Sequence, residues 1–158
     1  MSSYQNLGTK LRHLVELLDT DVTSCYQSLG LTDYKPKYTP VFKALIENGA
    51  STIGVITEKA GISQPAISKT VREMTQVGLI QKVKAKDARE SKIELTEAGK
   101  VMVPLLQNQW QATTQAAKKL DQELPNSLFK AIEEANIALN KQSFLERILI
   151  ERSNEEDS

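Results

Sequence analysis

Apolar side chains recur every three or four positions near the start of the chain. The positions are Leu7, Leu11, Leu14, Leu18, Val22, Cys25 and Leu29. This spacing predicts a long helix over residues 4–29, with Gly30 ending it. The apolar seam is longer than a small domain needs for its own core. It therefore favours packing against another long helix, such as one from a second copy of the chain.

The last third of the chain has the same helical period. One helix is expected from Thr96 to about Leu120, and Pro104 should bend or interrupt it near Lys100. A last helix is expected over residues 125–150, followed by a polar, acidic tail.

Two short helices are predicted before the turn at Gly61. Thr39 should cap the first of them, which runs to Asn48. Thr52 should cap the second, which ends where Gly61 can adopt a left-handed backbone conformation. Ser63 follows and has a side chain able to cap a third helix.

The helix that follows Ser63 separates its side chains into two faces. At about 100° per residue, one arc of roughly 140° holds mostly polar and basic residues: Gln64, Pro65, Ser68, Lys69, Arg72 and Gln76. The opposite arc holds mostly apolar ones: Ala66, Ile67, Thr70, Val71, Met74 and Val77. One face is therefore expected in the core, and the other is a donor-rich strip without an acidic residue. Such a strip suits the major groove, where base edges and phosphates are mostly acceptors.

Two short strands are predicted after Gly78, which should end the donor-rich helix. Three apolar positions indicate the first strand: Leu79, Ile80 and Val83. Alternation over residues 92–95 indicates the second strand. The loop between them carries Lys84, Lys86 and Arg89. A helix-turn-helix followed by a basic hairpin is a winged helix.

Charge and cysteine content narrow the function classes. The 158 residues include 20 Lys+Arg and 20 Asp+Glu, so the total charge does not indicate nucleic-acid binding. Within residues 52–96 the basic side chains outnumber the acidic ones, eight to five: Lys59, Lys69, Arg72, Lys82, Lys84, Lys86, Arg89 and Lys92 against Glu58, Glu73, Asp87, Glu90 and Glu94. A single cysteine excludes an intrachain disulfide, and the polar start lacks a signal-like apolar run. We therefore expect a cytoplasmic protein without a membrane segment.

Several short motifs, in this order, resemble those of the MarR-type winged-helix transcription regulators. They are Gly61-Ile62-Ser63-Gln64, Ser68-Lys69, Val77-Gly78-Leu79-Ile80, Asp87-x-Arg89 and Leu95-Thr96-x-x-Gly99. Helix order and chain length match as well, so the resemblance covers roughly residues 4–150. The sequence departs from the family at Thr57, where an alanine is usual, and in a wing with fewer arginines.

The expected fold is mainly α with a small β-wing: a winged helix-turn-helix flanked by long dimerisation helices. Residues 1–158 would form a single MarR-like protomer, with the DNA-binding part at 52–96 and dimerisation helices at 4–30 and 97–150. We expect a homodimer that binds double-stranded DNA at a pseudopalindromic site, with half-sites about 34–36 Å apart. The resemblance also implies a repressor whose DNA affinity falls when a small aromatic or anionic effector binds.

The candidate DNA-binding residues lie on the donor-rich helix and in the wing. They are Ser63, Gln64, Pro65, Ser68, Lys69, Arg72, Lys84, Lys86, Asp87 and Arg89. Gln64 can pair with adenine, and Pro65 can contact a thymine methyl group. In the family that it resembles, an Asp-x-Arg pair such as Asp87 and Arg89 places the arginine in the minor groove. The plainer interpretation is that these side chains are solvated surface groups.

The sequence gives weaker indications of an effector pocket, a redox-active cysteine or a metal site. Tyr38, Phe42 and Trp110 could line an effector pocket, although core packing is the commoner fate of such side chains. Cys25 should be a small buried hydrophobe, and a lone His13 does not make a zinc site. The sequence has no glycine-rich phosphate loop and no metal-ligand cluster, so we expect neither a cofactor nor an enzyme.

Two functions stay open at this point. The favoured one is a sequence-specific DNA-binding regulator, and the alternative is a winged-helix protein-interaction module that binds a protein with the same strip. Salt dependence separates them, because binding that neutralises phosphates weakens steeply as salt rises.

Overall fold

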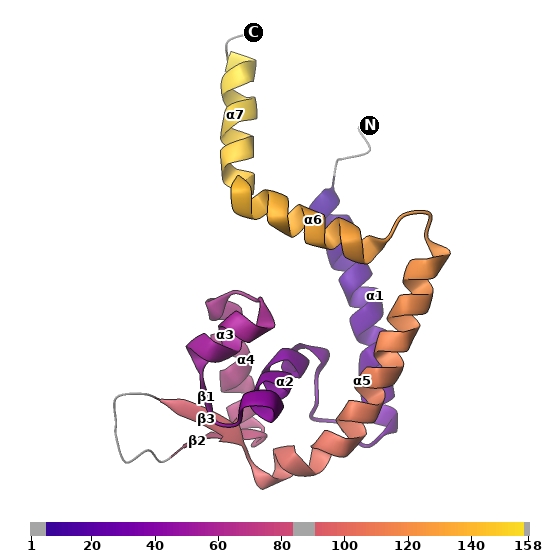
Figure 1. The fold of residues 1–158 in the computed structure, drawn as a ribbon, viewed down its shortest axis with the longest axis vertical. Helices are drawn as coiled ribbons and strands as arrows, with labels where there is room; N and C mark the ends of the chain where they lie inside the picture. Colours follow the sequence, from indigo (N-terminus) through magenta and orange to yellow (C-terminus); the bar gives the residue numbers. More distant parts are fainter. Residues whose placement is uncertain (1–5, 84–90, 157–158) are drawn as a thin grey trace. The chain divides into compact units, whose positions relative to one another are not determined.

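A computed structural model describes residues 6–83 and 91–156 of the chain (Figure 1). The elements in order are α1 (Leu7–Ser28), η1 (Pro36–Tyr38), α2 (Thr39–Asn48), β1 (Ser51–Thr52), α3 (Ile53–Ala60), α4 (Gln64–Gln76), β2 (Ile80–Lys82), β3 (Lys92–Leu95), α5 (Glu97–Glu123), α6 (Leu128–Lys141) and α7 (Phe144–Glu156). The chain divides into two compact units, Met1–Trp110 and Gln111–Ser158. The predicted fold class, mainly helical with a small β-wing, is confirmed.

The sheet has three antiparallel strands in the order β1-β3-β2. The predicted hairpin is β2 and β3, in which Ile80 lies opposite Leu95. The sequence did not predict β1, because two residues are too few to show an alternating pattern. Thr52 ends that strand and also caps α3, since its side chain accepts a hydrogen bond from the Val55 amide at 3.3 Å. The predicted cap at Thr52 is therefore confirmed.

Helix α1 contributes one buried residue to the first unit, and it is an aromatic one. Tyr26 is 1% exposed, whereas Leu7 and Leu11 of the predicted apolar seam are about half exposed. Cys25, which we expected to be buried, is also exposed. The first unit covers the seam only in part: Leu14 and Val22 are half-buried, and Val22 packs against the core.

An aromatic cluster fills the core where α1, η1 and α2 meet. The Tyr34 ring packs edge-on against Tyr26, Tyr38 and Phe42, with centroids 4.6, 5.8 and 5.2 Å away. The indole nitrogen of Trp110, on α5, donates to the Tyr26 hydroxyl at 3.1 Å. Burial raises the pKa of Tyr34, whose hydroxyl is hydrogen-bonded to the Thr39 hydroxyl at 2.9 Å. Thr39 itself is the first residue of α2, and Tyr38 occupies the N-cap position.

The start of α5 is fastened to the end of α4 through one hydroxyl group. Thr96 donates its side-chain hydrogen to the Gly78 carbonyl at 2.6 Å and accepts the Gly99 amide at 3.1 Å. The Thr96 amide also donates to the Leu79 carbonyl at 3.0 Å. A side chain at position 99 would collide here, because a Cβ on Gly99 would overlap the Leu79 carbonyl oxygen. The Leu95-Thr96-x-x-Gly99 motif thus forms a close joint between β2, β3 and α5.

Pro104 was expected to bend or interrupt the helix near Lys100. Helix α5 continues through Pro104, so of these two outcomes the interruption does not occur. The proline removes one donor, which would have bonded to the Lys100 carbonyl, and the long helix tolerates that single loss.

The prediction of one last helix over residues 125–150 is wrong, because α6 and α7 are separate. Ser143 begins α7 with a capping box: its hydroxyl accepts the Glu146 amide at 3.2 Å, and Glu146 accepts the Ser143 amide at 2.7 Å. Helix α6 is capped by Ser127, which accepts the Lys130 amide at 3.1 Å. The side chain of Asp121 also accepts the Leu128 amide, at 2.7 Å.

We predict that Gly99→Ala destabilises the protein by about 1–3 kcal/mol, because the new methyl group meets backbone that has to move. The gain in helix propensity, about 1 kcal/mol, offsets only part of this cost. Chemical denaturation measures the change. Gly54→Ala in α3 is the matched control, since its Cβ would meet only the Thr52 hydroxyl at 3.7 Å. Equal stability of the two variants would contradict the proposed close contact.

Candidate nucleic-acid interface

The turn between α3 and α4 has the geometry predicted from sequence. Gly61 is left-handed, with φ 63° and ψ 25°, and its amide donates to the Thr57 carbonyl at 3.1 Å. Ser63 occupies the N-cap position of α4, but its side chain does not make the expected capping hydrogen bond. Its carbonyl instead accepts the Ile67 amide at 3.1 Å. Pro65 lies in the first turn, where its missing amide hydrogen costs little.

Helix α4 has one buried face and one exposed face. The buried side chains are Ile67, Thr70, Val71 and Met74. The exposed ones include Gln64, Pro65, Lys69, Arg72 and Gln76, and Ser68 is half-buried. This division confirms the predicted faces, except that Ala66 and Val77 are exposed rather than buried.

Gly78 ends the helical path with φ 76°, and two reverse hydrogen bonds close the last turn. The Leu79 amide donates to the Met74 carbonyl at 3.0 Å, and the Gly78 amide donates to the Thr75 carbonyl at 3.1 Å. This Schellman motif turns the chain directly into β2, so α4 and the first wing strand are joined by only three residues, Val77 to Leu79.

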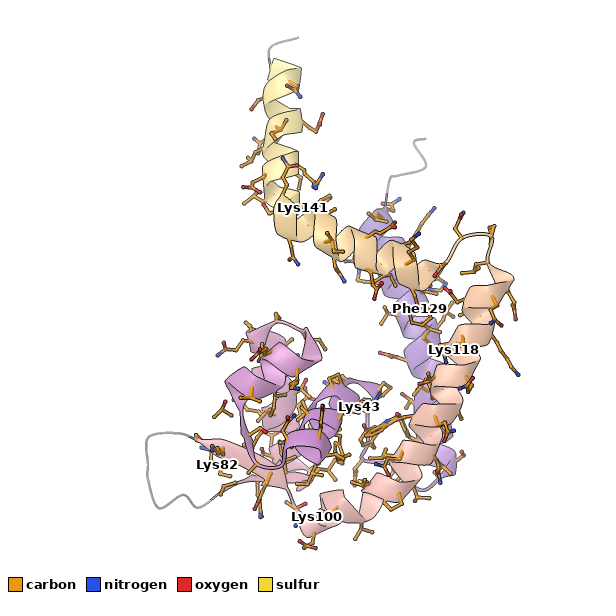
Figure 2. The ribbon with its side chains drawn as sticks, viewed as in Figure 1. Lys43, Lys82, Lys100, Lys118, Phe129 and Lys141 are labelled. Carbon is orange, nitrogen blue, oxygen red and sulfur yellow. The ribbon has the colours of Figure 1, made fainter. Side chains whose placement is uncertain are left out.

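The candidate wing residues Lys84, Lys86, Asp87 and Arg89 lie outside the described residues, and their roles stay predictions. The two strands that lead to them are described. Lys82 is exposed at the end of β2 (Figure 2). Gln81 and Glu94 are paired across the strands, with Gln81 Nε2 donating to Glu94 Oε1 at 3.0 Å.

An ionic cluster that the sequence did not reveal lies on the flank of α4. Glu73 Oε2 is 2.6 Å from Lys37 Nζ and 3.7 Å from Lys35 Nζ. The ammonium group of Lys37 holds the pKa of Glu73 below its usual range, and the charges of Lys35 and Lys69 act in the same direction. Burial raises the pKa of the neighbouring Tyr38, and the Glu73 charge adds to the effect. The lysines precede Glu73 by 36 or more positions, so no local spacing could have indicated the contact.

The three candidate effector-pocket residues are all buried in the core. Tyr38 and Phe42 are fully buried, and Trp110 is 9% exposed. Lys43 Nζ lies 5.3 Å from the centre of the Trp110 ring, a cation–π distance. An effector pocket at these residues stays a prediction.

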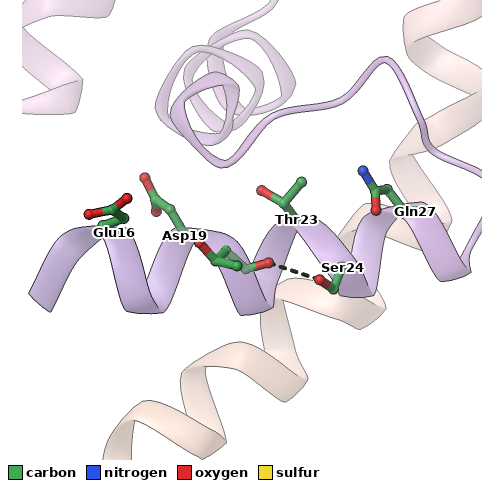
Figure 3. Close-up of a pocket in the computed structure, with 6 residues that line it drawn as sticks. Glu16, Asp19, Thr23, Ser24 and Gln27 are labelled. Carbon is green, nitrogen blue, oxygen red and sulfur yellow. Dashed lines mark hydrogen bonds between the residues drawn. The ribbon is translucent and has the colours of Figure 1, made fainter. Parts of the chain in front are cut away.

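Surface hollows lie elsewhere among the described residues of the first unit. One, of about 460 Å³, is lined by polar side chains of α1: Glu16, Asp19, Thr20, Thr23, Ser24 and Gln27 (Figure 3). Another, of about 380 Å³, lies where the end of α2 meets β3 and the start of α5, with Ile46, Leu95 and Lys100 among its lining residues.

Comparison with known families identifies the winged motif. The model of the family described as "Sugar-specific transcriptional regulator TrmB" matches residues 26–105, which is half of the chain. The chain belongs to that family. Its match extends from Tyr26 of the aromatic cluster to Leu105 of α5, so it includes the whole helix-turn-helix and both wing strands.

Solved structures show which fold accompanies this motif. A MarR family regulator from Neisseria meningitidis is 19% identical, covers 100% of both chains and has a TM-score of 0.52. The M. tuberculosis transcriptional regulator MOSR, solved in complex with DNA, is 16% identical over 87% of this chain and 96% of that chain, with a TM-score of 0.63. Streptococcus pneumoniae FabT, also solved with DNA, is 16% identical over 92% and 99%, with a TM-score of 0.54. The expected resemblance to MarR-type regulators is confirmed at the level of the fold.

A comparison with curated proteins found no match. Within residues 6–83 and 91–156, the helices include none that combines the length and apolar character of a membrane span.

The lowered pKa of Glu73 predicts a pH-dependent contribution to stability. Because the folded-state pKa lies below the unfolded one, the contribution is fully present above about pH 5 and is lost as pH falls through the folded value. Wild type should therefore exceed Glu73→Gln in melting temperature at neutral pH, and the gap should close in acid. Thermal denaturation from pH 7 to pH 3 measures it. Glu58→Gln, which removes an exposed carboxylate from α3, is the control, and a gap that does not change with pH would rule out the ion pair as its cause.

Proposed function

We propose that this protein is a sequence-specific, DNA-binding transcription regulator that inserts α4 into the major groove. The exposed face of α4 carries the proposal, because it presents amide, hydroxyl and cationic donors on a helix whose other face is buried. The family to which the chain belongs consists of transcription regulators, and two structures with the same fold were solved with DNA.

The N-terminal turn of α4 is the part that would approach the base edges most closely. Gln64 and Pro65 lie there and are exposed, so they are suited to adenine and to a thymine methyl group. Lys69 and Arg72 lie one and two turns farther along the helix and would contact phosphate or guanine. Ser63 has a hydroxyl that does not cap α4, which leaves it suited to a phosphate oxygen.

A homodimer is the assembly that we propose for DNA binding. On α1 the large apolar side chains are 45–55% exposed: Leu7, Leu11, Val15, Leu17 and Leu18. Helix α6 has no buried residue in the described chain, and α6 and α7 expose Phe129, Ile132, Ile137, Leu139, Phe144, Leu145, Ile148, Leu149 and Ile150 (Phe129 is labelled in Figure 2). Apolar surfaces of this extent are rare on monomers and mark interaction sites. A second copy would cover them and would place two α4 helices on a pseudopalindromic site.

We further propose that the dimer is a repressor and that a small ligand releases it from DNA. Such a ligand must bind more tightly to a dimer geometry that does not fit the operator, since equal affinity for both geometries shifts nothing.

We predict that Lys69→Ala and Arg72→Ala each weaken binding to an operator selected from the source genome by about 1–3 kcal/mol if the side chain reads a base. A side chain that contacts phosphate should instead weaken binding to all duplexes and lower the salt dependence. Fluorescence anisotropy at several salt concentrations distinguishes these outcomes. Gln115→Ala, an exposed position on α5, serves as the control. Binding to protein but to no duplex would support the protein-interaction alternative.

We also predict a dimer in solution at micromolar concentration. Leu11→Asp on α1 and Leu145→Asp on α7 place charges on the exposed apolar surfaces and should shift the dimer toward monomer. Light scattering coupled to size exclusion measures the mass. Glu16→Gln, on the polar side of α1, should leave the mass unchanged. A wild-type protein that is strictly monomeric would remove the dimer from the proposal.

A further inference from the structure

Glu73 connects the recognition helix to a segment that precedes the winged motif in the chain. It follows Arg72 on α4, and its Oε2 lies within ion-pair distance of Lys37 and Lys35. Lys69, one turn earlier on α4, acts on the same carboxylate. Two lysine side chains therefore share one glutamate carboxylate, and a third lysine lies close enough for its charge to act on it.

The exposure of these groups shows which of them faces solvent. The Glu73 side chain is 24% exposed and its Oε2 is buried, whereas the side chains of Lys35 and Lys37 are 56% and 45% exposed. The carboxylate is thus on the inside and the two cationic side chains are on the outside. An ammonium group has three donors, so Lys37 can keep its bond to Glu73 and still donate to an outside acceptor.

The backbone that carries the two lysines is held in place. Pro36, between them, restricts its own φ and begins η1. Tyr38, the next residue after Lys37, is fully buried in the aromatic cluster. Lys35 Nζ also lies 6.0 Å from the centre of the Tyr38 ring. The backbone of this segment and the two lysine side chains are thus already held in place. Binding a partner would therefore cost little further conformational entropy.

We propose that Lys35 and Lys37 form a phosphate-binding pair that extends the DNA contact beyond α4, with Glu73 as its positioning residue. The partner is the backbone of the same duplex, on the strand that borders the groove occupied by α4. Glu73 lies about 100° around the helix from Arg72, so the pair flanks the donor-rich face rather than sharing it. Its contacts would add affinity without selecting bases.

This inference rests on the proposed function, and its test uses the salt dependence of duplex binding. Lys35→Gln/Lys37→Gln is compared with wild type on a 40-base-pair duplex of mixed sequence, by fluorescence anisotropy from 50 to 300 mM salt. Each lost phosphate contact makes the negative slope of log K against log salt shallower by about 0.9. The slope of the double variant should therefore be shallower by about 1.8 per bound protomer. Glu73→Gln keeps both lysines but removes the carboxylate that positions them, so its slope should lie between those of wild type and the double variant.

The matched control is Lys118→Gln/Lys119→Gln, which removes the same charge from two adjacent positions on α5. An unchanged slope in the Lys35/Lys37 variant, with wild type binding normally, would overturn the inference and leave the proposed function intact. An equal loss in the control would also overturn it, because net charge would then be the cause. If wild type itself binds no duplex with a salt-dependent affinity, the proposed function fails first.

Discussion

The hydrogen bond between Trp110 and Tyr26, inside the aromatic cluster, joins parts of the chain that are 84 residues apart. It holds α5 to α1, while the Tyr34 ring holds α1 to η1 and α2 by edge-on contacts. Each such pair contributes roughly 0.5–1.5 kcal/mol beyond the burial of its surface. The pairs share Tyr34, so removing that ring would affect three contacts together. The winged motif is built on this support, because α2 packs against α3 and α4.

A second constraint fixes the position of the recognition helix within the first unit. Helix α4 ends in the Schellman turn at Gly78, and the carbonyl of that glycine receives the Thr96 hydroxyl. The end of α4, the strands of the wing and the start of α5 are therefore tied at one point. On the flank of α4, Glu73 adds an ionic connection to η1. The exposed donors of α4 are consequently presented by a helix that is held at its end and along its side.

The sequence alone predicted most of the local structure of the motif, although it missed β1 and the side chain of Ser63 does not cap α4. The 3.6-residue period predicted both faces of α4. Gly61, Pro65 and Gly78 predicted the turn before α4, its first turn and its end, because the two glycines adopt a positive φ and the proline needs no amide hydrogen in a first turn. The comparison with families and solved structures agrees with the fold that the motifs indicated. One error arose although a local signal was present. The capping box at Ser143 and Glu146 lies within an apolar period that continues across it, so the break between α6 and α7 was missed.

Contacts between residues far apart in the chain could not be predicted from local sequence patterns. Leucines on α1 indicated an apolar face, but periodicity does not say what covers it, and Tyr26 is the residue that the first unit buries. The cluster at Glu73 depends on lysines from a distant segment, so only the folded chain brings it together. The candidate contacts on α4 could be placed by angle, whereas the flanking lysines could not.

The joint at Thr96 limits how this position can change during evolution. One oxygen there both donates to Gly78 and accepts from Gly99, so valine, which has the same shape, would lose both bonds at once. Serine preserves the hydroxyl and is the natural substitute. Only threonine and serine can therefore make both of these hydrogen bonds at the junction of wing and long helix.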